Sequence, residues 1–134
     1  MEESRAARLT RLVRLQRQLE RMAENDLLHV TRERARLDER REATITALAT
    51  FSPLHQAMAS TYSDGFRGLD ARSQRLEAMQ KMQEKRLLIE RTKADRLDET
   101  AGEAREAEAR GAEDEALLDL LDMVLPQGRR SSPA

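Results

Sequence analysis

The sequence predicts an all-α protein that folds as a long antiparallel two-helix coiled-coil hairpin, with a short helical or kinked tip and a short C-terminal amphipathic segment. Charged residues make up 37% of the 134 residues and aromatic residues only 2%, so bulky side chains are too few to fill a globular core. Neither proline nor glycine occurs in residues 1–51 or 69–101. Both stretches also carry apolar residues at seven-residue steps, the repeat on which two helices pack side by side.

Residues 4–51 are expected to form the first helix. A seven-residue step along this segment links Leu9, Gln16, Ala23, Val30, Leu37, Thr44 and Phe51. The companion step is expected at Leu12, Leu19, Asp26, Glu33, Arg40 and Ala47, with Val13, Leu27 and Leu48 widening the stripe. Helix propensity alone seldom holds a helix of this length, so its single apolar stripe must pack against a partner helix.

Proline and turn-forming residues predict a tip over residues 52–65. Ser52 followed by Pro53 is typical of the end of one helix and the start of another. The stretch STYSDG, residues 60–65, clusters residues that favour turns. The aromatic residues of the chain lie in or beside this tip: Phe51, Tyr62 and Phe66. Aromatic residues are enriched at protein interfaces, so they either bind a partner or cap the end of the hairpin core.

Residues 66–122 are expected to form the second helix, which completes a single helical hairpin over residues 1–122. Its seven-residue step links Leu69, Leu76, Gln83, Glu90, Leu97, Ala104, Gly111 and Leu118. The companion step contains Phe66, Leu87, Ala94 and Ala101. Gly102 and Gly111 each weaken the helix by about 1 kcal/mol relative to alanine. Pro126 and Gly128 are expected to end it before a disordered tail at residues 126–134.

Charge complementarity predicts where the chain turns. Residues 5–21 hold six arginines and one glutamate. With a turn near residue 60, this segment lies opposite residues 99–115, which hold seven carboxylates and two arginines. With a turn at Ser52, it lies opposite residues 83–99, whose charges cancel. The later turn is favoured, because flanking charges set the register of coiled coils.

Three arginines are expected on the side of the first helix opposite its leucine stripe. They are Arg14, Arg17 and Arg21, which helical spacing gathers on one face. This face either binds an external protein or is simply solvated.

The segment EALLDLLDMVLPQG, residues 115–128, carries more apolar side chains than the edge of a two-helix hairpin covers. Its candidate partner-binding residues are Leu117, Leu118, Leu120 and Leu121. An acidic amphipathic helix of this kind suits an apolar groove on another protein. Alternatively, the segment folds back on the start of the first helix and closes the hairpin.

Catalysis, cofactor binding and metal binding find no support in the sequence, and an enzyme is not expected. The chain has no cysteine, its two histidines lie in separate sections, and no glycine-rich phosphate-binding motif occurs. The net charge of −1 and the lack of aromatic residues among the arginines argue against nucleic acid as a partner. No signal peptide and no apolar run of about 18 residues is seen, so a cytoplasmic protein without membrane insertion is expected.

Two stretches rich in Arg, Glu, Gln and Leu carry a resemblance to a known family. They are RLTRLVRLQRQLERMAENDLLHVTRERARLDERREA and RLEAMQKMQEKRLLIERTKADRLDETAGEAREAEA. The chain resembles the FliJ family over residues 4–122. FliJ proteins are small coiled-coil components of the bacterial flagellar type III export apparatus and are related to the YscO proteins of injectisomes.

The resemblance implies a cytoplasmic, non-enzymatic protein that is similar to the central stalk of rotary ATPases. The implied partners are the hexameric export ATPase, the export gate and export chaperones, with membrane association only through the apparatus. The basic N-terminal turns and the Leu-rich C-terminal segment would face the ATPase. The hairpin middle and tip, around Phe51, Tyr62 and Phe66, would face the gate. A different hypothesis is a secretion chaperone that binds an export substrate through its Leu-rich C-terminal end.

Overall fold

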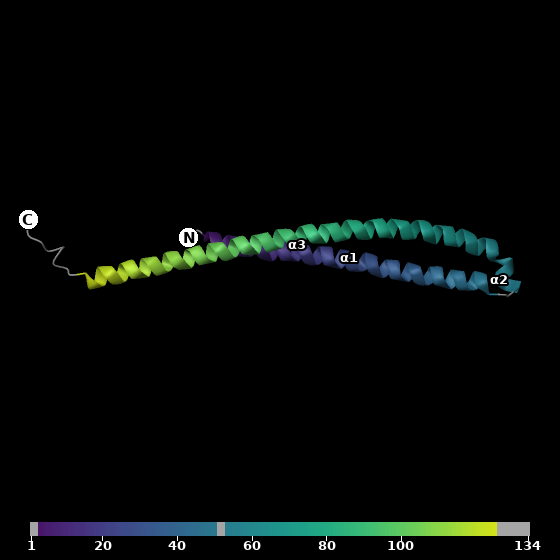
Figure 1. Cartoon of the computed structure of the whole chain (residues 1–134), viewed down its shortest axis with the longest axis horizontal. Coiled ribbons are helices and arrows are strands. Elements are labelled where there is room, and N and C mark those ends of the chain that lie inside the picture. Colours follow the sequence, from purple (N-terminus) through teal and green to yellow (C-terminus); the bar gives the residue numbers. More distant parts are fainter. Residues whose placement is uncertain (1–2, 51–52, 126–134) are drawn as a thin grey trace, which may run out of the picture. The chain divides into compact units, whose positions relative to one another are not determined.

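The chain is all-helical in the computed structural model, which describes residues 3–50 and 53–125 (Figure 1). Three helices follow one another: α1 (Arg5–Ala49), α2 (Pro53–Ala57) and α3 (Ala59–Val124). None of the described residues lies in a strand. The prediction of an all-α protein is therefore confirmed, and the extensive contacts between the two long helices agree with a helical hairpin.

Ser4 caps the N-terminus of α1. Its Oγ accepts a hydrogen bond from the backbone N–H of Ala7 at 3.1 Å, and its carbonyl oxygen accepts one from the N–H of Arg8 at 3.0 Å. A capping side chain satisfies one of the backbone N–H groups that every helix start leaves without a partner. The helix thus begins one residue later than expected, and it ends at Ala49.

The connection between the long helices is shorter than the tip expected over residues 52–65. α2 opens at Pro53, whose fixed φ suits the first position of a helix. Met58 alone separates α2 from α3, and helical hydrogen bonds continue through it. The Met58 N–H donates to the Leu54 carbonyl at 3.1 Å, and the Tyr62 N–H donates to the Met58 carbonyl at 2.9 Å. The turn-forming stretch is therefore helical, because a context of continuous helical hydrogen bonds overrides weak local propensity.

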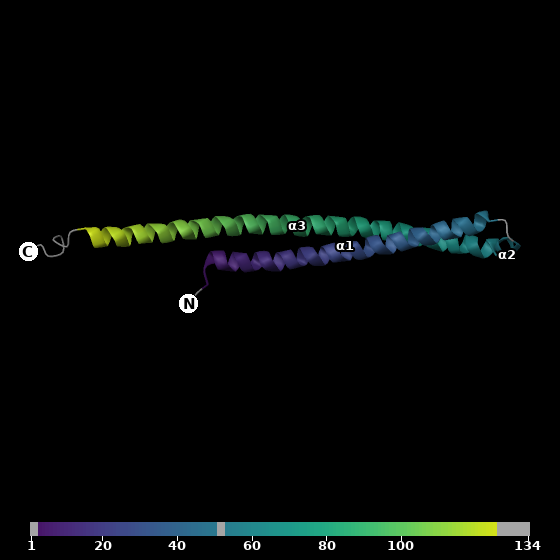
Figure 2. The same ribbon diagram turned by 90° about the horizontal axis from the view of Figure 1, so that it is seen from below.

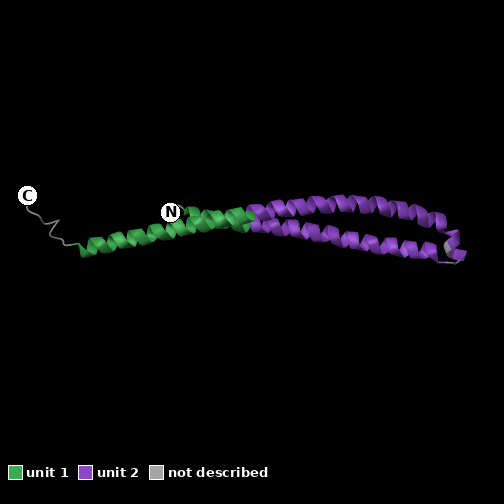
Figure 3. Ribbon diagram, in the orientation of Figure 1, with its two compact units in different colours: residues 1–15, 94–134 green, residues 16–93 purple. Residues whose placement is uncertain are grey.

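The chain divides into two compact units, shown in different colours in Figure 3. The central unit comprises residues 16–93, and the terminal unit comprises residues 1–15 with 94–134. Each unit contains one segment of α1 and one of α3. Phe51 and the tail expected at 126–134 lie outside the described residues, so their predicted roles are not addressed by the structure.

In the central unit, α1 and α3 run antiparallel side by side, as both views show (Figure 2). Arg86 Nη1 lies 2.7 Å from Asp26 Oδ2, and Arg34 Nη1 donates to Gln80 Oε1 at 3.0 Å. The register favoured by charge would have placed Asp26 opposite Ala94, eight residues further along α3 than Arg86. That register is therefore wrong, because α3 starts at residue 59 and brings the turn closer to the end of α1.

One of the two seven-residue steps predicted for the first helix is confirmed by burial, and the other is wrong. Ala23, Val30 and Leu37 of the first step are buried. Leu12 and Leu19 of the predicted companion step are exposed. The side chains that accompany the first step are buried or half-buried and include several polar ones: Ala6, Val13, Glu20, Leu27, Arg34 and Arg41. The apolar character of Leu12 and Leu19 therefore predicted the companion step on the wrong side of the helix.

Both steps predicted for the second helix follow its buried face as far as residue 104. The buried residues on these steps are Leu76, Ala94, Ala101 and Ala104, together with Ser73. Among residues 3–50 and 53–125, a single cluster of large apolar residues joins Val30, Leu37 and Leu76, with Leu69 packed against it, all in the central unit. Every described residue from 105 to 125 is exposed, so Gly111 and Leu118 do not extend the seam.

In the terminal unit, the start of α1 lies against α3 near residues 105–108. Glu108 Oε1 accepts a hydrogen bond from the backbone N–H of Ala6 at 3.0 Å, and Arg105 Nη1 donates to Thr10 Oγ1 at 3.1 Å. A carboxylate at a helix N-terminus is favourable because it satisfies an open N–H and complements the helix dipole. The more acidic residues that follow Glu108 lie beyond these contacts, so they do not neutralise the arginines of α1 as predicted.

Candidate functional site

The three arginines predicted to share an outward face have different surroundings. Arg17 Nη1 lies 2.8 Å from Glu20 Oε2, and the Arg17 side chain is only 31% exposed. The prediction that Arg17 points freely outward is therefore wrong. Arg21 is exposed in the central unit. Arg14 is exposed in the terminal unit, where it lines a shallow hollow of about 340 Å³ together with Arg11 and Arg105.

Glu20 is a buried carboxylate in the contact between α1 and α3 of the central unit. Arg17 donates to its Oε2 at 2.8 Å, and Arg91 Nε donates to its Oε1 at 3.1 Å. These hydrogen bonds, that from Arg17 first, lower the pKa of Glu20. Glu20 and Glu24 in turn raise the pKa of Arg91. The lowered pKa of Glu20 and the raised pKa of Arg91 both favour the charged forms, so the network is a structural link between the helices and not an acid–base site.

The aromatic residues near α2 are partly held by the hairpin itself. Tyr62 and Phe66 are half-buried. The Arg41 guanidinium carbon lies 5.4 Å from the centre of the Phe66 ring, which is within the range of a cation–π interaction between α1 and α3. Phe66 therefore closes this end of the helix pair, which agrees with the structural alternative for the aromatic group.

The Leu-rich end of α3, residues 113–125, is exposed as a continuous helix to Val124. The four predicted leucines are between 54% and 61% exposed: Leu117, Leu118, Leu120 and Leu121. The segment does not fold back on the start of α1. It holds five carboxylates and no cation, and none of these carboxylates pairs with another described residue. It is therefore an acidic amphipathic helix without a covering partner among the described residues.

A second surface, which sequence reasoning missed, lies on one side of the central unit. The Asp26–Arg86 ion pair joins α1 and α3 on this side. Five exposed apolar side chains lie on the same side: Leu19, Met22, Met79, Met82 and Ile89. Each is three, four or seven residues from Asp26 or Arg86 on its own helix, which places it on the same helical face. Six cations occupy the same rows: Arg36, Arg40, Arg72, Arg75, Arg86 and Lys93. We call this surface the basic apolar face. The opposite side carries the pair between Glu24 and Arg91.

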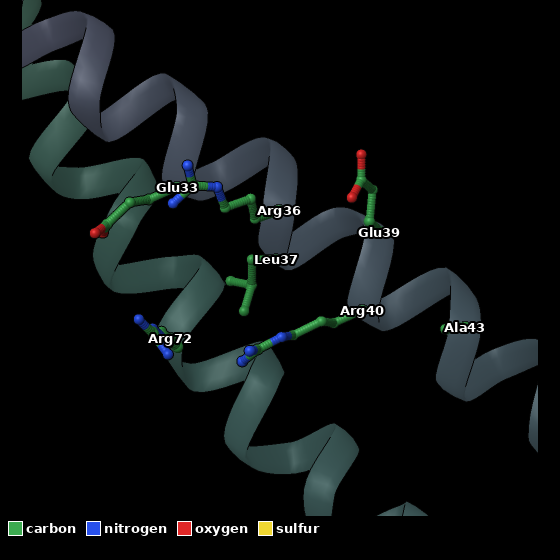
Figure 4. A pocket seen from close by; sticks show the side chains of 7 residues that line it. All are labelled: Glu33, Arg36, Leu37, Glu39, Arg40, Ala43 and Arg72. Atoms are coloured by element: carbon green, nitrogen blue, oxygen red, sulfur yellow. The ribbon is translucent and has the colours of Figure 1, made fainter.

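A shallow hollow of about 460 Å³ lies at one end of the basic apolar face. Figure 4 shows Arg40 reaching from α1 toward α3, where Arg72 lies, with Leu37 between the helices and Glu39 turned away. The side chains of Arg36, Arg40 and Arg72 make no hydrogen bond or ion pair with another described residue. The hollow therefore combines the apolar Leu37 and Ala43 with three arginines whose side chains have no partner in the described part of the chain, and Glu33 and Glu39 also line it.

No family model, curated protein or solved structure matches the chain. The surfaces described above therefore carry the functional argument. Within the described ranges, no helix is both long enough and apolar enough to cross a membrane. The same residues contain no group of three or more His, Asp or Glu side chains arranged to hold a metal ion.

Proposed function

We propose that this protein is a non-enzymatic interaction protein whose hairpin is an antiparallel coiled coil, and that it serves as a stalk-like partner of the ATPase and gate of a flagellar or type III export machine. The class of interaction protein rests on the two exposed surfaces. The assignment to an export machine rests on the resemblance of residues 4–122 to the FliJ family. Two long helices with a short connection agree with the fold that this resemblance implies.

The observation that carries the proposal is the exposure of the Leu-rich end of α3. Leu117, Leu118, Leu120 and Leu121 are each more than half exposed on a helix that continues past the last contact with α1. Contiguous exposed apolar patches on a protein mark interaction sites. An amphipathic helix binds by placing its apolar stripe in a groove of the partner, which is how this end would engage an ATPase subunit.

The polar seam between the helices supports a role that depends on a partner. Glu20, Arg34 and Gln83 occupy positions that large apolar residues fill in a stable coiled coil. Only one small cluster of large apolar residues supports the described helix pair. A hairpin of this kind gains stability when another protein covers its open surfaces.

The direct test is stimulation of a purified export ATPase. As a stalk, the full chain is expected to raise ATP turnover at less than one copy per ATPase subunit. A variant with the four leucines at 117, 118, 120 and 121 changed to serine is expected to lose the effect. A matched variant with Leu28→Ser and Leu88→Ser, two exposed leucines outside the Leu-rich end, is expected to keep it. No stimulation by the unmodified chain, or equal loss in both variants, would count against the stalk role.

A secretion chaperone is the second candidate function, and the same acidic Leu-rich end favours it. A chaperone is expected to form a complex of fixed ratio with an export substrate and to leave ATP turnover unchanged. Affinity purification of the tagged chain from native lysate, with identification of bound proteins by mass spectrometry, separates the two. An ATPase or gate protein lost with the serine variant supports the stalk, and filament or hook proteins alone support the chaperone.

A further inference from the structure

We propose that the basic apolar face is the docking site for the Leu-rich end of a second copy of this chain, so that two copies associate through their C-terminal helices. This inference does not rest on the proposed role in export. It rests on the match between two surfaces of the same chain, both exposed and opposite in charge.

The face is a single surface made by both helices of the central unit. Asp26 and Arg86 meet at 2.7 Å across the helix pair, which brings their two helical rows side by side. Met22 lies four residues before Asp26, and Met82 and Ile89 lie four before and three after Arg86. Side chains at these spacings share one face of a helix. The exposed Met22, Met82 and Ile89 therefore flank the ion pair as one apolar strip.

Charge identifies the occupant as acidic. The two rows of the face hold six cations and two carboxylates, Asp26 and Glu33. Four of the cations have no partner among the described residues: Arg36, Arg40, Arg72 and Arg75. The Leu-rich end, residues 113–125, holds five carboxylates and no cation. Complementary charge steers partners together and fixes how they align, and long arginine side chains reach past an apolar contact to carboxylates on its rim.

Shape and length also agree. In the Leu-rich end, Leu117, Leu121 and Val124 recur at helical spacing as one stripe, while Glu115, Asp119 and Asp122 form another. The apolar stripe of the Leu-rich end, from Leu117 to Val124, is about 10 Å long at about 1.5 Å per residue. The exposed apolar residues that α3 contributes to the face, from Met79 to Ile89, span about 15 Å. A third helix laid along two helices covers such a strip, and the hollow beside Arg40 and Arg72 leaves room at one end.

The occupant belongs to a second copy because the Leu-rich end continues the same α3 helix that forms the face. A helix that runs unbroken from Ala59 to Val124 does not fold its own end back on its earlier turns. Each copy offers one face and one end, so two copies can exchange ends with twofold symmetry. On this reading the Leu-rich end serves either the second copy or the ATPase at any one time.

The first test measures the mass of the full chain in solution by light scattering, over a wide range of protein concentration and at low and high salt. We expect a reversible dimer that weakens as salt rises. Ile89→Asp is expected to raise the dissociation constant at least about tenfold, because it places a carboxylate in the apolar strip beside an acidic helix. Leu88→Asp is the matched control: Leu88 is one residue away and 64% exposed, but lies on the side of Arg91. Helix content measured by circular dichroism checks that both variants fold.

The second test uses disulfide formation between copies, for which the chain is suited because it has no cysteine. Ile89→Cys and Met82→Cys are each combined with Leu121→Cys or Leu117→Cys, which covers both directions of the docked helix. Because a disulfide needs Cα atoms within about 7 Å, a covalent product reports docking between copies. At least one pair is expected to give a covalent dimer, whereas Leu88→Cys combined with the same partners is expected to give little.

A chain that is monomeric at every concentration overturns the proposal and assigns the face to an acidic helix of another protein. A dimer that tolerates Ile89→Asp, or that cross-links equally well through position 88, also overturns it. An unmodified chain that self-associates but does not stimulate the ATPase would reject the export role alone. An unmodified chain that stimulates the ATPase but stays monomeric would reject the docked second copy alone.

Discussion

Replacing Gln83 by leucine is expected to stabilise the hairpin. Gln83 is half-buried on the seam of α3, and its Oε1 atom is buried without a hydrogen-bond partner among the described residues. Gln80, three residues earlier on the companion step, provides a matched control. Its Oε1 accepts from Arg34 at 3.0 Å, and its Nε2 donates to Glu84 at 3.1 Å. The two glutamines have the same chemistry and similar burial, but only one has its oxygen satisfied.

The expected magnitudes follow from this difference. A buried polar atom without a partner costs about 1–3 kcal/mol in stability. The cost for Gln83 is expected in the lower half of that range, because its side chain is only half-buried between two helices. Gln83→Leu removes the cost and adds apolar contact, so the free energy of unfolding is expected to rise by about 1–2 kcal/mol. Gln80→Leu gives up a hydrogen bond to a guanidinium and leaves Arg34 without it. The free energy of unfolding is therefore expected to fall by about 1 kcal/mol.

Urea unfolding followed by far-ultraviolet circular dichroism measures both variants at one fixed protein concentration. For a chain of this size, a gain of 1 kcal/mol corresponds to a rise in Tm of about 3–5 °C. If Gln83→Leu leaves stability unchanged or lowers it, the Oε1 atom is satisfied by water and the reasoning fails. If Gln80→Leu stabilises as much as Gln83→Leu, apolar character at the seam decides stability, and the hydrogen bonds of Gln80 contribute nothing.

Three further predictions follow from the described contacts. Leu37→Ala is expected to lower the free energy of unfolding by about 2–4 kcal/mol in urea unfolding, because Leu37 is 3% exposed in the one cluster of large apolar side chains. Hydrogen bonds from Arg17 and Arg91 lower the pKa of Glu20 below its ordinary 4.5 in the folded chain, so the unfolded chain binds the proton more readily. The stabilisation by Glu20 is therefore complete above about pH 4.5 and lost as pH falls through the lower folded pKa, and Glu20→Gln is expected to flatten this part of a profile of stability against pH. Gly111→Ala is expected to raise the helix content and the free energy of unfolding by about 0.5–1 kcal/mol, since an added Cβ meets no atom within 4 Å.

The pattern of apolar residues predicted α3 better than α1. Along α3, alanine and leucine mark the buried steps directly, as at Leu76, Ala94 and Ala101. Along α1, the apolar Leu12 and Leu19 were predicted to be buried, but both are exposed and the charged Glu20 is buried instead. Glu20 tolerates this position because Arg91 of α3 and Arg17 of α1 neutralise it. A single-helix pattern does not contain that information, because it depends on which residues of the other helix lie opposite.

The register was mispredicted for a related reason. Charge matching assumed that surface ion pairs select the pairing of the helices, but exposed pairs contribute only about 0–1 kcal/mol each. The place of the turn decides the register, and the turn depends on whether residues 60–65 break the helix. They do not, and α3 begins at Ala59. The exposure of the Leu-rich end was one of two alternatives that the sequence left open, since its seven apolar residues could also have folded back on the start of α1.

The basic apolar face was readable from the sequence but was not recognised. Residues 72, 75, 79, 82, 86, 89 and 93 alternate spacings of three and four, with four cations and three apolar residues and no acid. This is the pattern of an amphipathic row that runs beside the buried seam of the same helix. Its counterpart on α1 became visible only when the Asp26–Arg86 contact placed the two rows on one side.

The polar seam connects the stability of the hairpin to the binding of its partner. Each unsatisfied or charged seam position changes stability by about 1–3 kcal/mol, as argued for Gln83. A partner that binds only the folded hairpin adds about 2.7 kcal/mol when its concentration is a hundred times its Kd. Partner binding is therefore as large a contribution as any single seam residue. It follows that Gln83→Leu, by stabilising the free hairpin, should make its melting temperature less dependent on protein concentration if association and folding occur together. If the hairpin is already fully folded as a monomer, that dependence should be the same with glutamine or leucine at position 83.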